Sequence, residues 1–355
     1  MNRNRKIKVF LGGYVNFLNA QNINCRALSE YLDKDKFDIW TILFWYQNAS
    51  DFEKVSGVHY LRSFRPCRFL GWIPFFLGIL LCDVAYLPKG EYNVLTRIVA
   101  RLSGCKLFTT LEGVLRGTNL SKLSNPKEYI GHYRSFEPNL YAITKYMADA
   151  ANQDFQLNFN PKVLYLGVKA DQFFTRSNPR TELKNIVLVG NNLKYKGLTD
   201  FLVVAEHFPN LTFHIIGGGD MPEEDRTAYL AKHGNLVLHG VCDHAKMSKI
   251  LADMDLMFFP SRSEGFPKVM LETACAGVPT LCYSDYGANE WIDSGRNGFV
   301  VDTYQQAKDV IQYLIDNPDK LQSVSSAAVE LGKSFDWKII VKSWEEEIEK
   351  IAGKK

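Results

Sequence analysis

The pattern of hydrophobic and polar positions along the chain predicts strands that alternate with helices. The runs 6–13, 37–45 and 83–88 are short and apolar, as buried strands are, whereas 23–32 and 198–208 carry apolar residues at helical spacing. Further strands are expected at 105–113, 140–145, 162–168, 185–190, 211–220, 235–240, 254–260 and 278–283. Strands separated by helices are typical of a parallel sheet covered on both faces, so the pattern predicts an α/β fold.

The polar, proline-containing segment 173–185 interrupts this alternation, which then begins afresh. A chain of 355 residues also suits two domains of ordinary size. We therefore expect a doubly wound domain over residues 1–172, a second one over 173–335, and a C-terminal helix within 336–355 that crosses back to the first domain. In such sheets a ligand lies at the carboxyl ends of the strands, so we expect it between the two domains.

Glycines gather at these expected strand ends. Gly12 and Gly13 follow the first strand, Gly190 follows the first strand of the second half, and Lys196 precedes a helix start at Gly197. A glycine there lets a ligand approach backbone N–H groups, and a helix N-terminus attracts phosphate. Tight turns require glycine too, so each position alone has a structural explanation. As a set they indicate a nucleotide site.

The stretch SRSEGFPKVMLETACAGVP (261–279) places two carboxylates around an expected helix start. Glu264 precedes a first turn formed by residues 266–269, and Glu272 lies one turn further in. Carboxylates accept hydrogen bonds from vicinal hydroxyls, and N–H groups at the helix start bind phosphate. A diphosphate with a sugar on one side and a ribose on the other would satisfy the two carboxylates and the N–H groups at the helix start. The alternative is that Glu272 only pairs with Lys268, four residues earlier.

This stretch resembles the signature of retaining glycosyltransferase family 4, in which two glutamates separated by seven residues precede A-x-G-x-P. Residues 188–202, 214–220 and 285–302, and the pair 141–150 with 164–174, resemble further segments of that family in the same order. The N-terminal half resembles it in outline. The resemblance implies the GT-B fold, two Rossmann-like doubly wound domains facing across a cleft, with an acceptor-binding first domain and a nucleotide-sugar-binding second domain.

Carried over by residue, the resemblance implies that Glu272 binds the donor ribose, Glu264 faces the transferred sugar as a catalytic group, and Lys196 clamps the diphosphate. The donor-binding residues so implied are Gly12, Gly13, Gly190, Asn191, Lys196, Gly218, Val241, Phe266, Pro267, Lys268, Val269 and Glu272. No metal is expected, because lysine and helix N-termini neutralise the leaving diphosphate and no paired-carboxylate loop for Mg²⁺ is present.

Two positions depart from the family pattern. Asn191 stands where the family has arginine, so the diphosphate clamp rests on Lys196, with Lys194 or Arg262 as possible additional cations. Glu112, at the end of strand 105–113, stands where the family has histidine. We predict that Glu112 is a catalytic or substrate-recognition group. The alternative for Glu112 is a solvated loop carboxylate.

Charge is distributed unevenly along the chain. Residues 1–170 hold 22 basic and 13 acidic residues, whereas the remainder holds 20 and 26. The apolar run 69–82, preceded by Arg62, Arg65 and Arg68, is shorter than the roughly 18–20 residues that span a bilayer. It is either a core helix or a helix on an anionic membrane surface. A plain solvated surface would also explain the basic half, and nucleic acid is not expected because no aromatic-basic motif appears.

The seven cysteines are scattered without a CxxC pair, which indicates reduced thiols and a cytoplasmic protein, peripheral at the inner membrane face if the membrane interpretation holds. Together these observations predict a retaining glycosyltransferase that moves a hexose from a UDP- or GDP-sugar to a glycan or lipid-linked acceptor in cell-surface polysaccharide synthesis. The alternatives are a GT-B nucleotide-sugar epimerase and a non-catalytic GT-B scaffold.

Overall fold

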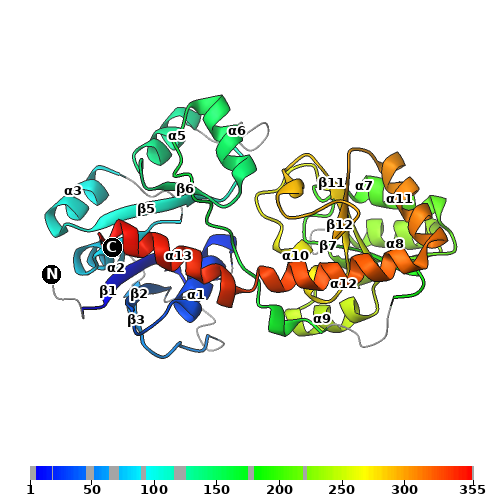
Figure 1. Ribbon diagram of the computed structural model, residues 1–355, viewed down its shortest axis with the longest axis horizontal. Coiled ribbons are helices and arrows are strands. Elements are labelled where there is room, and N and C mark those ends of the chain that lie inside the picture. The colour runs from blue at the N-terminus through cyan, green and yellow to red at the C-terminus, as the bar shows by residue number, and fades with distance from the viewer. Residues whose placement is uncertain are drawn as a thin grey trace. The chain divides into compact units, whose positions relative to one another are not determined.

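The computed structural model describes residues 5–17, 19–44, 52–63, 72–88, 93–115, 125–174, 180–218 and 222–353 (Figure 1). The chain forms two compact units. One comprises Met1–Leu166 together with Trp337–Lys355, and the other comprises Gly167–Asp336. These divisions lie within a few residues of the boundaries expected at 172/173 and 335/336.

The first unit is built on a six-stranded parallel sheet. Its strands are β1 (Ile7–Tyr14), β2 (Phe37–Phe44), β3 (Val58–Ser63), β4 (Val84–Tyr86), β5 (Lys106–Leu111) and β6 (Leu140–Ala142). Its helices are α1 (Ala20–Tyr31), α2 (Trp72–Leu81), α3 (Val94–Ser103), α5 (Pro126–Arg134), α6 (Lys145–Phe155) and α13 (Trp337–Ile351). The order is β3-β2-β1-β4-β5-β6, so the winding reverses between β1 and β4.

The second unit repeats this winding. Its strands are β7 (Asn185–Gly190), β8 (Thr212–Gly217), β9 (Leu236–Gly240), β10 (Leu256–Phe259), β11 (Thr280–Tyr283) and β12 (Gly298–Val301). Its helices are α7 (Leu198–His207), α8 (Glu223–Lys232), α9 (His244–Ala252), α10 (Lys268–Cys275), α11 (Tyr304–Asp316) and α12 (Pro318–Ser334). The order β12-β11-β10-β7-β8-β9 reverses between β7 and β10. The prediction of two doubly wound α/β units is confirmed.

Side chains cap most helices where the chain leaves a strand. Thr144 follows β6 and accepts a hydrogen bond from the N–H of Met147 in α6. Asp243 caps α9 in the same way, through the N–H of Lys246. α10, like α7 and α8, lacks such a cap, since its N-cap residue is Pro267 and no side chain bonds its first turn. The start of α10 therefore leaves backbone N–H groups without a side-chain cap.

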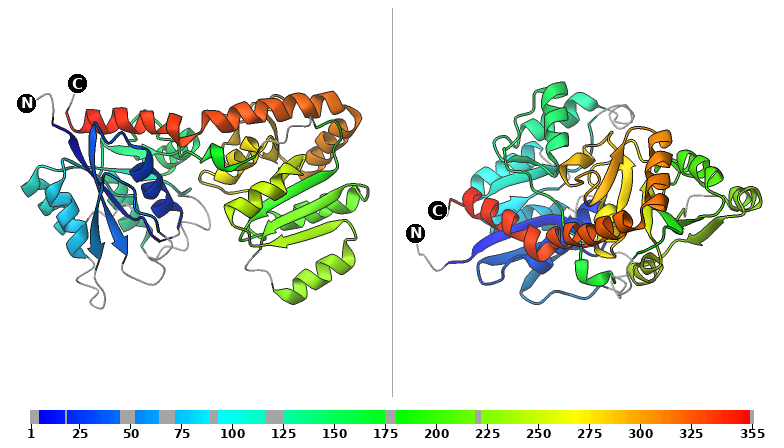
Figure 2. Two further views of the ribbon diagram at one scale, coloured as in Figure 1. Left: turned by 90° about the horizontal axis from the view of Figure 1, so that it is seen from below. Right: turned by 45° about the vertical axis from the view of Figure 1, so that its right-hand side comes forward.

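The C-terminal helix α13 completes the core of the first unit (Figure 2). The indole of Trp344 is fully buried, and its Nε1 donates to the carbonyl oxygen of Tyr165 at 2.9 Å. The carboxylates of Glu345 and Glu347 are buried and accept from the N–H of Asp33 at 2.9 Å and the hydroxyl of Tyr141 at 2.7 Å. Both apolar packing and buried polar contacts thus fix α13.

Gly12 and Gly13 lie within β1, so the expectation that they follow the first strand is wrong. The pairing of β1 with β2 slips between Leu11 and Tyr14. A Cβ at Gly12 would lie 3.0 Å from the carbonyl oxygen of Tyr86, and one at Gly13 would lie 2.8 Å from Sγ of Cys25. Close packing inside the unit therefore explains why both positions are glycine.

The strand expected at 162–168 is also wrong. Leu164 donates its N–H to the carbonyl of Ala142, but beyond that the segment has only an isolated bridge from Val168 to Asp336. It is the connection by which the chain enters the second unit. The apolar run at 69–82 contributes α2, and within the described residues no helix has the length and apolar character to cross a bilayer. Arg65 and Arg68 lie outside the described residues.

Candidate active site

The strand order of the second unit reverses between β7 and β10, where ligands of doubly wound sheets bind. Lys196 follows β7, and Glu264 follows β10. The Nζ of Lys196 lies 2.7 and 2.8 Å from the two carboxylate oxygens of Glu264. The side chains are only 21% and 9% exposed, and Ser261 donates a further hydrogen bond to Glu264. A partly buried ion pair, which the sequence did not reveal, therefore occupies the reversal point.

One glycine makes room for the Lys196 side chain, and another lets the backbone beside it approach the end of β10. A Cβ at Gly190 would lie 2.8 Å from Cγ of Lys196. Gly197 has φ +84°, and a Cβ there would lie 2.1 Å from the carbonyl oxygen of Pro260. The ammonium group lies 5.4 Å from the centroid of the Phe259 ring, a cation–π distance. The chain is thus shaped to hold Lys196 across the ends of β7 and β10.

The next strand end is also constrained by glycine. Gly217 has φ +109°, and a Cβ there would lie 2.0 Å from the carbonyl oxygen of Gly190. The N–H of Gly218 donates to that same oxygen at 2.9 Å. Gly217 and Gly218 therefore join the ends of β7 and β8. Val241, one residue beyond β9, exposes 64% of its surface, which leaves an apolar side chain available to a ligand.

α10 begins at Lys268, so the first turn expected at 266–269 starts later than predicted. The first N–H groups of a helix have no partner within the helix, and the helix dipole favours an anion beside them. Phe266, just before the helix, packs its ring against Trp291, with centroids 5.3 Å apart. The uncapped N-terminus of α10 follows the loop that carries Glu264. This arrangement suits a phosphate group.

Glu272 lies in α10, with its side chain 16% exposed. Burial raises the pKa of its carboxyl group, and the nearby charges of His244 and Lys268 act in the opposite direction. Nε2 of His244 lies 3.8 Å from Oε1 of Glu272. Glu272 is therefore a partly buried acceptor with His244 as well as Lys268 beside it, and pairing with Lys268 is not its whole environment.

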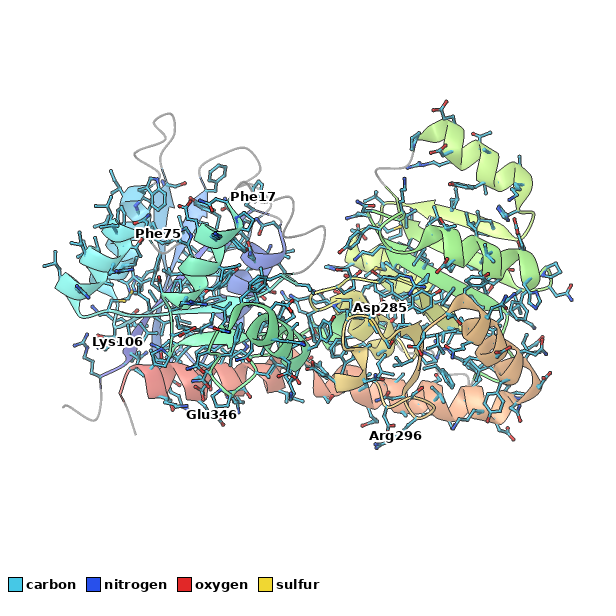
Figure 3. The ribbon with its side chains drawn as sticks, turned by 90° about the horizontal axis from the view of Figure 1, so that it is seen from above. Phe17, Phe75, Lys106, Asp285, Arg296 and Glu346 are labelled. Atoms are coloured by element: carbon cyan, nitrogen blue, oxygen red, sulfur yellow. The ribbon has the colours of Figure 1, made fainter. Side chains whose placement is uncertain are left out.

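The two departures from the family pattern have different surroundings. Asn191 is exposed at the end of β7. Arg262 lies 3.2 Å from Asp285, which Figure 3 labels, and 3.8 Å from Asp200. Its guanidinium lies over the Tyr283 ring at 4.4 Å. Two carboxylates therefore share the Arg262 guanidinium, and its part in holding a diphosphate stays a prediction.

Glu112 follows β5 in the first unit and is held by buried polar groups. The hydroxyl of Tyr86 donates to it at 2.8 Å and the amide of Asn24 at 3.0 Å. The hydroxyl of Thr110 lies 3.3 Å from the same carboxylate. Burial, and secondly the charge of Glu112, raise the pKa of Tyr86. This is not the setting of a solvated loop carboxylate. No motif around position 112 pointed to Tyr86 or Asn24 as its partners.

Among the described residues, no group of three or more His, Cys, Asp or Glu side chains is arranged to hold a metal ion. The histidines that come together are a pair. Nδ1 of His214 lies 3.0 Å from Nε2 of His239, and the rings stack. Burial, with His239 adding to it, lowers the pKa of His214 to about 4, so this pair is neutral near pH 7.

Comparison with known proteins bears directly on the second unit. Residues 169–330 match the family described as Glycosyl transferases group 1. The chain is 27% identical over 174 residues to alpha-galactosylglucosyldiacylglycerol synthase of Streptococcus pneumoniae, covering 47% of this chain and 46% of that protein. It is 23% identical over 205 residues to the GtfA subunit of a UDP-N-acetylglucosamine–peptide N-acetylglucosaminyltransferase of the same species, covering 54% and 40%. The chain spans about half the length of these curated relatives.

Similarity to solved structures extends over both units. The chain matches Anabaena Alr3699/HepE in complex with UDP and glucose with a TM-score of 0.76 at 16% identity, covering 97% of this chain and 100% of that one. At this identity the match establishes the fold. Residues 169–330 thus carry the match to the glycosyl transferases group 1 family, and the two six-stranded units of the chain have the GT-B fold, as the sequence predicted.

Proposed function

We propose that the protein is a retaining glycosyltransferase that moves a hexose from a nucleotide-diphosphate sugar to a glycan or lipid-linked acceptor. The observation that carries this proposal is the Lys196–Glu264 pair at the strand-order reversal, followed by the uncapped start of α10. A cation, a helix N-terminus and a carboxylate are what a diphosphate joined to a hydroxyl-bearing sugar requires.

In the proposed donor complex the Lys196 ammonium exchanges one anion for another. It turns from the carboxylate of Glu264 towards the diphosphate, and the first N–H groups of α10 bind the same phosphates. Glu264, released from its cation, accepts hydrogen bonds from the sugar hydroxyls. Glu272 accepts from the ribose hydroxyls, for which its partial burial is favourable because fewer water molecules compete.

The remaining residues of the set take supporting parts in this proposal. Gly190, Gly217 and Gly218 keep side chains away from the phosphates, and Asn191 contributes an amide where the family has an arginine. Val241 contacts the base, and Phe266 to Val269 form the wall beside the sugar. Gly12 and Gly13 belong to the first unit and shape the end of β1, where their packing leaves backbone without side chains.

Charge on the diphosphate grows as the bond between the sugar C1 and the phosphate oxygen breaks. Lys196 and the α10 N–H groups are fixed donors that stabilise this charge, so we propose transfer without a metal cofactor. Glu112 is a second carboxylate, oriented by Tyr86 and Asn24. We assign it to recognition of substrate hydroxyls or to catalysis.

The donor and acceptor classes rest on the relatives. HepE was solved with UDP and glucose, and a relative is named for UDP-N-acetylglucosamine, so we propose a UDP-sugar ahead of a GDP-sugar. Another relative is named as a synthase of a glycosylated diacylglycerol. A lipid-linked acceptor in cell-surface polysaccharide synthesis, met by a cytoplasmic protein at an anionic membrane surface, is therefore the proposed setting.

A panel of UDP- and GDP-sugars tests this proposal, first by thermal shift and then by release of the nucleotide with and without EDTA. We expect stabilisation by one UDP-sugar and EDTA-resistant release of UDP together with a glycosylated product. An epimerised nucleotide sugar as the product would indicate the epimerase. Binding without any turnover on lipid-linked or glycan acceptors would indicate the scaffold.

Glu112→Gln tests the first unit's part in the reaction. This change keeps shape and hydrogen bonding but removes the charge. We expect transfer to fall about tenfold or more, or at least about 1.4 kcal/mol of transition-state stabilisation, with melting temperature and UDP affinity unchanged. The exposed Glu128→Gln in α5 serves as the matched control. Full activity of Glu112→Gln would reject the assignment of Glu112.

A further inference from the structure

Arg262 lies on the β10–α10 loop (residues 260–267), which also carries Glu264. Ser261 and Glu264 are buried and bonded to each other, whereas the side chain of Arg262 is 54% exposed. The guanidinium of Arg262 lies 4.4 Å from the centroid of the Tyr283 ring, a cation–π distance. Tyr283 is the last residue of β11, the strand that pairs with β10. Arg262 therefore joins the loop to the end of the neighbouring strand.

Asp200 connects the same loop to α7. It lies in the first turn of α7, four residues after Lys196. The hydroxyl of Tyr283 donates to Oδ2 of Asp200 at 2.6 Å, and Nη2 of Arg262 lies 3.8 Å from that oxygen. Burial, and secondly the hydrogen bond to Asp200, raises the pKa of Tyr283, so its hydroxyl keeps the proton that it donates. The contacts among these three side chains close on themselves, and we call them the Asp200–Tyr283–Arg262 triangle.

The triangle ties together the two segments that carry the Lys196–Glu264 pair. Lys196 precedes Asp200 by one helical turn, and Glu264 follows Arg262 by two residues. Asp285, two residues beyond β11, places a second carboxylate 3.2 Å from Arg262. Contacts outside the pair therefore help to set the position of Glu264 relative to the end of β7.

These outside contacts become more important when the donor is bound. In the proposed function Lys196 leaves Glu264 and turns to the diphosphate. Glu264 then keeps the hydrogen bond from Ser261, but both ends of that bond lie in the β10–α10 loop. It cannot hold the loop against the rest of the unit. The contacts of Arg262 reach α7 and β11, so they still anchor the loop after Lys196 has turned away.

We propose that Asp200, Tyr283 and Arg262 are positioning residues that orient Glu264 towards the sugar of the bound donor. This inference rests on the part of Glu264 in the proposed function. It gives Arg262 a different role from that of an additional diphosphate cation. The planar guanidinium of arginine can cover an aromatic ring and face two carboxylates at once, which the ammonium group of lysine cannot do. Arg262→Lys keeps the charge, so it separates the two roles.

Transfer kinetics and calorimetry with UDP test the proposal. Arg262→Gln, Tyr283→Phe and Asp200→Asn should each lower kcat about fivefold or more, while affinity for UDP changes less than about threefold. Arg262→Lys should lose about as much of kcat as Arg262→Gln. A variant that combines Arg262→Gln with Tyr283→Phe should lose little more than either single variant, because both changes remove the same anchor.

Hydrogen exchange followed by mass spectrometry gives a second measurement, which does not depend on turnover. In the UDP-saturated protein, Arg262→Gln should raise the exchange rate of the amides of residues 261–266 about tenfold. Arg296→Gln is the matched control. Arg296 pairs with Asp293 at 3.5 Å in an exposed turn of the same unit, and it lies well apart from Asp285 in Figure 3. This control should change neither kcat nor the exchange of the loop.

Three results would overturn the proposal. One is a fall in UDP affinity of about tenfold or more in Arg262→Gln that Arg262→Lys restores, since Arg262 would then bind the diphosphate as a cation. Another is a kcat of the wild-type size in both Arg262→Gln and Tyr283→Phe. The third is unchanged exchange of the loop in the UDP complex of Arg262→Gln. A wild type without transfer activity, together with raised loop exchange in Arg262→Gln, would reject the proposed function and confirm the anchor.

Discussion

Replacing Glu264 by glutamine and Lys196 by methionine should change the affinity for UDP in opposite directions. Lys196 neutralises Glu264 through both carboxylate oxygens, at 2.7 and 2.8 Å. A diphosphate that takes Lys196 as its counterion must compete with that carboxylate, and the carboxylate also repels it. Glu264→Gln removes both obstacles, whereas Lys196→Met removes the cation itself.

The magnitude follows from the burial of the pair. Exposed ion pairs contribute about 0.2–1 kcal/mol, and breaking a buried one costs about 3–5 kcal/mol. With Lys196 21% and Glu264 9% exposed, we place their coupling near 2 kcal/mol, or about 30-fold in affinity. Ser261 still bonds the residue at 264, so the release is partial. We expect Glu264→Gln to tighten UDP binding by about threefold to 30-fold, and Lys196→Met to weaken it at least about tenfold.

Titration calorimetry with UDP, at one pH and one ionic strength, measures both changes. The surface pair Lys232 and Glu206, 2.8 Å apart in the same unit, provides matched controls. Lys232→Met and Glu206→Gln should alter UDP affinity by less than about twofold. Sugar transfer by Glu264→Gln should be lost despite its tighter UDP binding. A Glu264→Gln variant that binds UDP more weakly than the wild type would refute the exchange of Lys196 between carboxylate and diphosphate.

Three other positions give independent predictions. Glu272→Ala should weaken UDP binding by roughly 1–3 kcal/mol in calorimetry, because the ribose hydroxyls lose a partly buried acceptor; unchanged affinity would reject that role. Gly217→Ala should lower the free energy of unfolding by about 3 kcal/mol or more, since its Cβ would lie 2.0 Å from a carbonyl oxygen. Gly104→Ala, at a position with φ +75° and open space around it, should lower it by only about 1 kcal/mol. Equal urea midpoints for the two variants would contradict this. His214→Asn should remove a loss of stability between pH 6.5 and pH 4.

The sign of the His214 effect follows from its lowered pKa of about 4. Above pH 6.5 both the folded and the unfolded chain hold a neutral imidazole. Between pH 6.5 and 4 the unfolded chain binds the proton and the folded chain does not. The free energy of unfolding therefore decreases as the pH is lowered from 6.5 to 4. Solvent reaches this half-buried ring, so we expect a loss of about 1–2 kcal/mol. A wild type and a His214→Asn variant with parallel urea midpoints over this range would contradict the prediction.

Much of the fold could be predicted because buried parallel strands are continuous apolar runs. The runs 185–190 and 254–260 correspond to β7 and β10 for this reason. β3 was missed, since it lies at the sheet edge and its VHYLRS sequence sets the exposed His59 and Arg62 among half-buried residues, with no continuous apolar run. Residues 162–168 were assigned wrongly because Leu164 and Leu166 are buried without joining a sheet. Burial and strand pairing are separate properties. A run of apolar residues predicts burial but not pairing in a sheet.

The contacts of the candidate site were harder to predict than its members. Lys196 and Glu264 were each assigned to a ligand, and nothing in either segment shows that they meet. They are brought together by the pairing of β7 with β10, which is a property of the sheet order and not of local sequence. The same holds for Glu112, whose partners Tyr86 and Asn24 come from β4 and α1. Local pattern identifies a residue type at a strand end, whereas topology decides its neighbour.

The return of α13 to the first unit has a consequence for synthesis on the ribosome. Residues 167–336 are contiguous and contain every element of their own sheet, so this unit can fold as soon as it emerges. The first 166 residues, although translated earlier, lack the helix that buries Trp337, Val341, Trp344 and Ile348. Until α13 has been synthesised, these residues expose to chaperones the apolar surface that the helix will cover. A chain terminated after Asp336 should keep a soluble second unit and a first unit prone to aggregation, so the part made first is the part completed last.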